Sequence, residues 1–450
     1  MTKDMTEGSP LKLIVSFALP LLLGNFFQQT YNIIDAAIVG KCLGEEELAS
    51  VGASSSVQFL ILGFCIGICC GFAIPVAQYF GGKKYDTMGE SIFHAGILSG
   101  GIALIMTVLC VLFCARILHM LSTPENIYEN AYRYLFIIFL GIPFTILYNL
   151  LSGIMRAVGD SKTPFFFLAF STVLNIVLDL TFIVAIRLGV SGAALATILS
   201  QAVSGILCFF YICRKSPVLH IKKEHCHLQK RHTRQMLFMG IPMGLQYSIT
   251  AVGSMVMQSA NNALGSIYIS GFTAGMRIKQ FLMCPFDAIG TAVSTFCSQN
   301  YGARKLPRIK TGLKKGIFMG VAYGIAIGII AICFGRPLSL LFLKASAAKA
   351  LDASGRYLAC LGLFFWCLGI LNICRLCVQG LGFSGRAIFS GILEMIARIL
   401  VSLIFVPIYH FNAICFADQC AWMSACLYIL PTCLYCIRKI ERAFREETAV

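Results

Sequence analysis

The segment Pro20–Asp35, PLLLGNFFQQTYNIID, decides the fold, because the chain contains a second copy of it. Alignment of Pro20 with Pro242 places it on Pro242–Met257, PMGLQYSITAVGSMVM, which keeps the proline and most of the apolar character. Further along, QYFG at 78–81 recurs in the second half of the chain as QNYG at 299–302. The sequence therefore predicts two structurally similar halves.

The composition is that of a membrane protein. Hydrophobic residues make up 58% of the 450 residues and charged residues only 12%, whereas a soluble protein of this length needs a largely polar surface. Barrel strands are short and alternate polar with apolar residues, so helices remain as the spanning structure. We expect an all-α integral membrane protein with twelve transmembrane helices in two pseudo-symmetric six-helix bundles. The predicted spans are 11–39, 48–80, 89–114, 128–155, 164–187, 190–213, 235–262, 268–300, 310–335, 351–379, 387–409 and 413–437.

The net charge of +16 is concentrated in alternate connections between these spans. Of the 36 Lys and Arg residues, 24 fall on one side, six in the opposite connections and six within spans. This split predicts that both termini are cytoplasmic and that the two halves are parallel repeats. It also argues against a nucleic-acid partner. The residues on the basic side are Lys3, Lys12, Lys83, Lys84, Arg156, Lys162, Arg214, Lys215, Lys222, Lys223, Lys230, Arg231, Arg234, Arg304, Lys305, Arg308, Lys310, Lys314, Lys315, Arg386, Arg438, Lys439, Arg442 and Arg445.

The predicted organisation is an N-terminal lobe at 1–213, a basic cytoplasmic linker at 214–234, and a C-terminal lobe with a cytoplasmic tail at 235–450. The 21 cysteines lie almost entirely in the apolar spans, where they act as small apolar residues rather than as a zinc site. A Walker A loop, a GxSxG elbow and a HExxH helix are all absent from the sequence. We expect no enzymatic activity, no metal and no cofactor. Two near-equal halves in a membrane chain are typical of a transporter.

The first span carries a polar face. Asn25, Gln28, Asn32 and Asp35 step by three, four and three residues, and Tyr31 lies beside them. Such a stripe faces a bundle interior or a water-filled cavity, because amides and carboxylates are costly in lipid. We predict that Gln28, Tyr31 and Asn32 line the substrate cavity.

A second polar group lies on the fifth and sixth spans. Asn175 and Asp179 share a helix face, and Thr197 adds a hydroxyl. The positions that correspond to the two carboxylates in the second half are Met257 and Ser402, so the carboxylates mark the first half as the place of ion coupling. If they converge, both cannot be ionised cheaply, and the pair would carry a proton. Alternatively, their oxygens would form a site for Na⁺. The residue pattern leaves both options open.

The second half has charges of its own. Glu394 and Arg398 are spaced i, i+4 in the favourable order, and Arg277 and Asp287 lie on the eighth span. We expect a C-terminal charge network that holds this bundle together, with substrate contact as the alternative.

Several motifs accompany these features: RAVGDSKTP at 156–164, GVSGAALAT at 189–197 and QNYGA at 299–303, in addition to Pro20, Asp35, Gln78, Gly81, Asn175, Asp179, Glu394 and Arg398. Together they resemble the multidrug and toxic compound extrusion (MATE) family. The resemblance implies two six-helix lobes, alternating access, and export of organic, often cationic, compounds against H⁺ or Na⁺. It also implies an ion site at the positions of Asp35, Asn175, Asp179 and Thr197, in a functional monomer of the bacterial inner membrane. A lipid-linked saccharide flippase and a passive channel are the alternatives.

The charge split makes a testable prediction about topology. A Lys222→Cys variant should react with a membrane-impermeant maleimide only from the cytoplasmic side, because the 214–234 loop carries seven of the basic residues. Labelling of intact cells or right-side-out vesicles measures it. Reaction of residue 222 from the outer face would overturn the predicted orientation.

Overall fold

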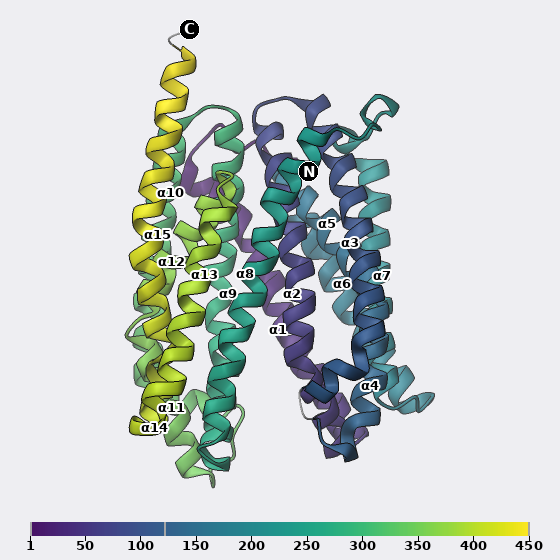
Figure 1. The fold of residues 1–450 in the computed structure, drawn as a ribbon, viewed down its shortest axis with the longest axis vertical. Coiled ribbons are helices and arrows are strands. Elements are labelled where there is room, and N and C mark those ends of the chain that lie inside the picture. The colour runs from purple at the N-terminus through teal and green to yellow at the C-terminus, as the bar shows by residue number, and fades with distance from the viewer. Residues whose placement is uncertain (1, 121–122, 449–450) are drawn as a thin grey trace. The chain divides into compact units, whose positions relative to one another are not determined.

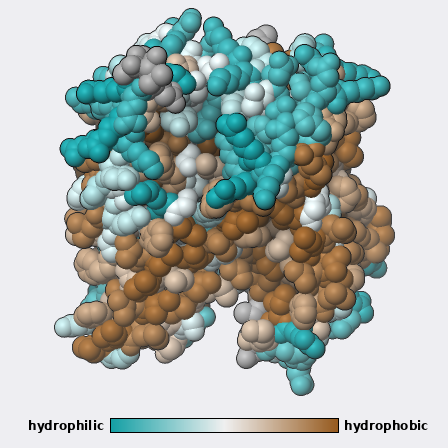
Figure 2. Space-filling model, turned by 45° about the horizontal axis from the view of Figure 1, so that its top comes forward, coloured by the Kyte–Doolittle hydropathy of each residue, from teal (hydrophilic) through white to brown (hydrophobic). Residues whose placement is uncertain are grey.

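The fold is all-helical in the computed structural model, which describes residues 2–120 and 123–448; the predicted lobe ends at 1 and 450 lie outside this range (Figure 1). Ten helices in the described residues are long and apolar enough to cross a membrane, or up to twelve if each of two bent pairs counts as one span. The predicted fold class is confirmed. Hydrophobic side chains cover much of the surface over the middle of the helices, and hydrophilic ones gather at the helix ends (Figure 2).

The chain packs as two compact units, named unit 1 and unit 2 here. Unit 1 contains the residues up to Asp4 and Leu23–Gly244, and unit 2 contains Met5–Leu22 and Leu245–Val450. The chain passes between units inside α1 (Pro10–Cys42) and α8 (Lys230–Asn262), in each case just after the repeated proline. From the sequence we expect the division in the 214–234 loop instead.

Each unit contains its own set of helices. Unit 1 comprises α2 (Glu45–Gly81), α3 (Tyr85–Met120), α4 (Glu125–Leu140), α5 (Ile142–Ala157), α6 (Lys162–Asp179), the π-helix Leu180–Ala185, α7 (Val190–Lys215) and two short 3₁₀ turns, Pro217–Leu219 and Lys223–His225. Unit 2 comprises α9 (Ser266–Gly302), α10 (Leu306–Ser339), α11 (Ala348–Gly362), α12 (Phe365–Gly380), α13 (Ser384–Leu400), the π-helix Val401–Phe405, α14 (Val406–Tyr409) and α15 (Phe411–Thr448).

Two predicted spans are bent rather than continuous. The span predicted at 128–155 consists of α4 and α5, which meet at an angle of 45° at Gly141. Pro143 lies in the first turn of α5, where its missing N–H leaves no broken hydrogen bond. The span predicted at 351–379 consists of α11 and α12, bent by 56°, and this break contains no proline.

The backbone repeats with the sequence. Of the ten described residues with positive φ, eight form four pairs with one member at the corresponding place in each half, and non-glycine residues adopt this conformation only rarely. Each half also has a π-helix in the same region, beginning at Leu180 in the first half and at Val401, two residues earlier in the alignment, in the second. The two halves therefore turn and distort at corresponding places. The pairs are Gly44 and Gly265, Lys83 and Arg304, Gly159 and Gly382, and Arg187 and His410.

Unit 2 is held together by aromatic packing and by close helix contacts. Phe365 stacks on Trp422 with ring centroids 5.9 Å apart. On α10, Gly320, Gly324 and Gly328 form a stripe against α11 and α12. A Cβ on Gly324 would lie 2.7 Å from the Phe365 carbonyl oxygen. Small residues of this kind let helix backbones approach closely, which is a main source of helix association in membranes.

The stripe predicts the effect of adding one methyl group. Gly328→Ala should lower the free energy of unfolding by about 1–3 kcal/mol, because the new Cβ would lie 2.3 Å from the Gly362 carbonyl oxygen and the helices must separate. Denaturation of the purified protein in detergent measures it. The matched control is Gly101→Ala, on the open surface of α3, where a Cβ meets nothing within 4 Å. Equal stability of the two variants would contradict the close-packing account.

Candidate functional site

Two carboxyl groups meet inside unit 1. Asp35 on α1 and Asp179, the last residue of α6, are in hydrogen-bonding contact. Asp179 is completely buried, and Asn175, one turn earlier, is 1% exposed. A hydrogen bond between two carboxyl groups needs a proton on one of them, since two carboxylates offer only acceptors. The structure therefore brings together the two acidic residues that the sequence pattern singles out.

Tyrosines surround this pair. The Tyr31 hydroxyl lies 3.1 Å from Thr197 Oγ1, which joins α1 to α7 beside the carboxyl pair. Tyr134 on α4 is 5% exposed, lies within electrostatic range of Asp35, and contacts Gln58 on α2. Sequence reasoning missed Tyr134 and Gln58. An isolated glutamine within an apolar run is the signal that could have revealed Gln58.

The local structure around Asp179 explains how it is positioned. Ser171 on α6 donates a hydrogen bond to the Ser200 carbonyl, at 2.9 Å, and Ser204 on α7 donates to the Phe167 carbonyl, at 3.2 Å. These bonds hold α6 and α7 in register. Immediately after Asp179 the helix becomes a π-helix, a distortion that often accompanies functional sites.

The predicted cavity residues separate in the structure. Tyr31 is half-buried and belongs to the carboxyl site, whereas Gln28 and Asn32 are exposed on α1. The polar stripe thus presents one part to the interior of unit 1 and another part to its surface.

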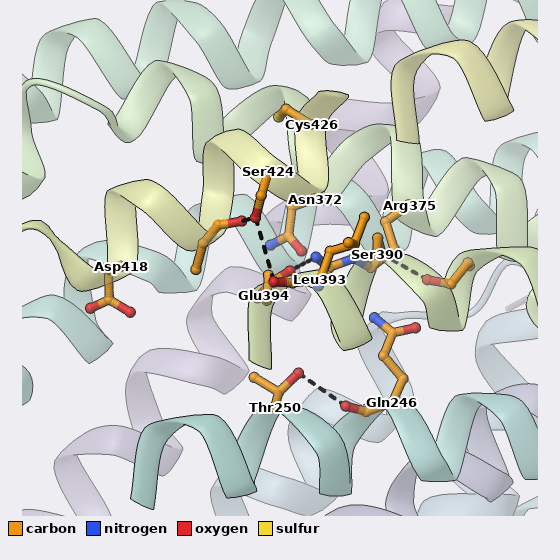
Figure 3. A network of polar contacts seen from close by, with 12 residues as sticks. Gln246, Thr250, Asn372, Arg375, Ser390, Leu393, Glu394, Asp418, Ser424 and Cys426 are labelled. Atoms are coloured by element: carbon orange, nitrogen blue, oxygen red, sulfur yellow. Dashed lines mark hydrogen bonds and ion pairs between the residues drawn. The ribbon is translucent and has the colours of Figure 1, made fainter. Parts of the chain in front are cut away.

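Unit 2 contains a buried ionic network (Figure 3). Asp418 on α15 is fully buried and accepts three hydrogen bonds. The donors are Lys279 Nζ at 2.5 Å, the Tyr357 hydroxyl at 2.8 Å and Arg398 Nε at 3.0 Å. Sequence reasoning missed Asp418, because its partners come from α9, α11 and α13, and sequence spacing reveals only contacts within one helix.

The network continues through Glu394 on α13. Glu394 forms ion pairs with Arg375 of α12 and, at 3.6 Å, with Arg398. Arg375 Nε also donates to the Ser390 hydroxyl, at 3.0 Å. Cations and carboxylates alternate along this series of ion pairs, which connects α9, α15, α13 and α12. The hydrogen bond from Tyr357 joins α11 to the same network. An arrangement of this kind satisfies buried charges with one another.

Two other predicted members of the network have different surroundings. Asp287 on α9 accepts a hydrogen bond from Asn372 Nδ2 at 2.8 Å rather than forming a close ion pair. Arg277 is only half-buried, and it has no ion pair within the part of the chain that the structure describes. Lys279, two residues further on, supplies the cation of α9 instead.

The histidines of the central loop hold that loop to α3. His225 Nε2 lies 3.4 Å from Asp86 Oδ1, and His232 Nε2 lies 3.0 Å from Glu90 Oε2. Across residues 2–120 and 123–448, no group of three or more His, Cys, Asp or Glu side chains is arranged to hold a metal ion.

Comparison with known proteins agrees with this architecture. The family model described as MatE matches residues 20–181 and 242–430, once in each half and beginning at the two repeated prolines. The chain belongs to the MATE family. It is 35% identical over 367 residues to the probable multidrug resistance protein YpnP of Bacillus subtilis, with 82% of each chain covered. It is 27% identical over 350 residues to the probable multidrug resistance protein YoeA of the same organism, with 76% of each covered.

A solved structure supports the fold independently. The crystal structure of a MATE protein in complex with MaL6 superposes with a TM-score of 0.92, covering 98% of this chain and 100% of that one, at 22% identity. The chain is therefore a multi-pass membrane transporter with the helical architecture of the MATE family.

Two MATE sequence motifs have structural roles here. Asp160 in the 156–164 motif caps α6, accepting from the Thr163 backbone N–H at 3.0 Å and from its hydroxyl at 2.7 Å. Gln299 and Asn300 in the 299–303 motif bind the Met5 backbone at 2.8 and 3.1 Å and so anchor the start of the chain to unit 2. Neither motif belongs to the carboxyl site.

The ionic network predicts a large stability effect at Asp418. Asp418→Asn should lower the free energy of unfolding by about 3–5 kcal/mol, because Lys279 and Arg398 would remain buried beside a neutral side chain. Denaturation in detergent measures it. The matched control is Asp352→Asn, because Asp352 pairs with Arg336 at 2.7 Å with both side chains 60% exposed, and its loss should cost less than about 1 kcal/mol. Similar losses in the two variants would show that the network contributes little.

Proposed function

We propose that this MATE protein is a secondary active exporter of organic cations, driven by an inward ion gradient and coupled through Asp35 and Asp179. The observation that carries the proposal is the direct contact between these two carboxyl groups in unit 1. The names of the two relatives, which describe probable multidrug resistance proteins, support drug-like substrates.

The contact suggests how ion and substrate exclude one another. With one proton between them, the two carboxyl groups carry a single negative charge. Loss of that proton leaves two negative charges in contact, which repel one another and attract a cation. A protonated pair and a bound organic cation are then alternative ways of balancing the same charge. This competition is what an antiporter requires.

The direct contact favours H⁺ over Na⁺ as the coupling ion. A sodium ion would have to lie between the two carboxyl groups, whereas these side chains contact one another directly. Asn175 and Thr197 remain the additional oxygen donors that a Na⁺ site would use. Imposed pH and Na⁺ gradients distinguish the two ions.

We place the protein in the bacterial inner membrane, with both termini in the cytoplasm and the monomer as the working unit. Export runs outwards, so that H⁺ enters as the organic cation leaves. Neither a metal nor an organic cofactor takes part.

Substitution of the two carboxylates tests the proposal. In proteoliposomes with an imposed pH gradient, Asp35→Asn and Asp179→Asn should each reduce tetraphenylphosphonium transport at least tenfold, since they remove the titratable group and keep its size. Asp287→Asn, which changes a carboxylate hydrogen-bonded within unit 2, should retain most of the activity. All three proteins should elute as folded monomers in detergent.

Two outcomes would contradict the proposal. Gradient-driven transport that survives the double substitution of Asp35 and Asp179 would exclude the pair as the coupling site. Equal transport with and without any imposed gradient, and no counterflow, would indicate a passive channel.

A further inference from the structure

A groove runs between α10 and α15 at the basic end of unit 2. The two helices lie side by side, and α15 is drawn in yellow (Figure 1). The groove has a volume of about 400 Å³. Each helix contributes four residues spaced i, i+3, i+4 and i+7, so that two helix faces oppose one another. The lining residues are Lys310, Leu313, Lys314 and Ile317 of α10, and Leu434, Ile437, Arg438 and Glu441 of α15.

The groove combines an apolar floor with a basic rim. Leu313 and Ile437 are 7% and 6% exposed and form its base, while Leu434 is 57% exposed and forms part of its wall. Lys310 and Glu441 bridge the two helices with an ion pair of 2.8 Å. Lys310 therefore balances the negative charge of Glu441. Any other cation in this groove gives it a net positive charge.

Lys314 and Arg438 supply that excess. Both are exposed, and neither forms an ion pair or a hydrogen bond among the described side chains. A second groove of about 630 Å³ lies along the adjacent face of α15 and shares Leu434 and Arg438 with the first. It adds Lys439 and Arg442 to the basic rim, together with one carboxylate, Glu446. Arg438 therefore stands between two grooves, each with apolar and basic walls.

The grooves continue into the apolar surface of the membrane-spanning part of the helices. Leu427 and Leu430 on α15 are 78% and 38% exposed, and Phe318 on α10 is 69% exposed. Such side chains face lipid in a transporter. The groove thus lies where the lipid-facing surface meets the basic helix ends, the level at which phospholipid headgroups reside.

We propose that this groove binds an anionic phospholipid, with its phosphate between Lys314 and Arg438 and an acyl chain along Leu434. Charge complementarity selects an anionic headgroup, because neither cation has an ion pair or hydrogen bond among the described residues and Lys310 already neutralises Glu441. The apolar floor selects a lipid over a free anion. Basic sites between transmembrane helices bind such headgroups through the same combination of contacts.

Lipid titration of the delipidated full-length protein tests the proposal. Native mass spectrometry in a neutral detergent should show tighter binding of dioleoylphosphatidylglycerol than of dioleoylphosphatidylcholine. Lys314→Gln with Arg438→Gln should weaken phosphatidylglycerol binding at least tenfold, since each basic side chain contributes about fivefold, and leave phosphatidylcholine binding unchanged. The matched control is Lys344→Gln with Lys349→Gln, two exposed lysines outside both grooves.

The acyl-chain contact has its own test. Leu434→Ser should weaken binding of both lipids, and an excess of inorganic phosphate should not displace bound phosphatidylglycerol. The proposal is overturned if wild-type protein binds the two lipids equally, or if the double glutamine variant binds like its control. It is also overturned if phosphate displaces the lipid or Leu434→Ser has no effect, because the groove would then be a simple anion site.

Discussion

The hydrocarbon core of a membrane provides no water, so every polar group within it must find a partner in the protein. The two units meet this constraint in different ways. In unit 2, the carboxylates Asp418 and Glu394 are matched by lysine and arginine side chains from other helices. In unit 1, Asp35 and Asp179 contact one another, and α1 and α6 carry no lysine or arginine between their end turns. A cation-balanced network is a stable structural element, whereas a pair of acids depends on a proton or another cation from outside.

This difference stands out because the two halves share a backbone plan. Four pairs of positive-φ residues and the helix breaks recur at corresponding positions, and each half has a π-helix in the same region, so the two units turn at corresponding places. The repeated scaffold would have allowed a carboxyl pair in either unit. In unit 2 the corresponding positions are Met257 and Ser402, 1% and 3% exposed, and the charges lie elsewhere. The internal repeat thus explains the similar folds of the two units. The sequence differences between the repeats explain why we propose ion coupling in unit 1 alone.

The sequence predicted the fold well, because the lengths of the apolar segments and the internal repeat can both be read directly from the amino-acid sequence. Helix spans follow from apolar runs, and the polar face of α1 follows from the spacing of its residues. The bends at Gly141 and between α11 and α12 did not follow, since an apolar run looks the same whether its helix is straight or broken. Asp418, Tyr134 and Gln58 were missed for another reason. Their partners lie on other helices, and single-sequence spacing contains no information about which helices touch.

Infrared difference spectroscopy of the purified protein tests the central claim, a proton shared by Asp35 and Asp179, most directly. The account predicts that the carbonyl band of a protonated carboxylic acid disappears when tetraphenylphosphonium binds, and that Asp179→Asn lacks this change. An unchanged carboxylic acid band while the cation binds, or the same change in wild-type protein and in the variant, would contradict the account.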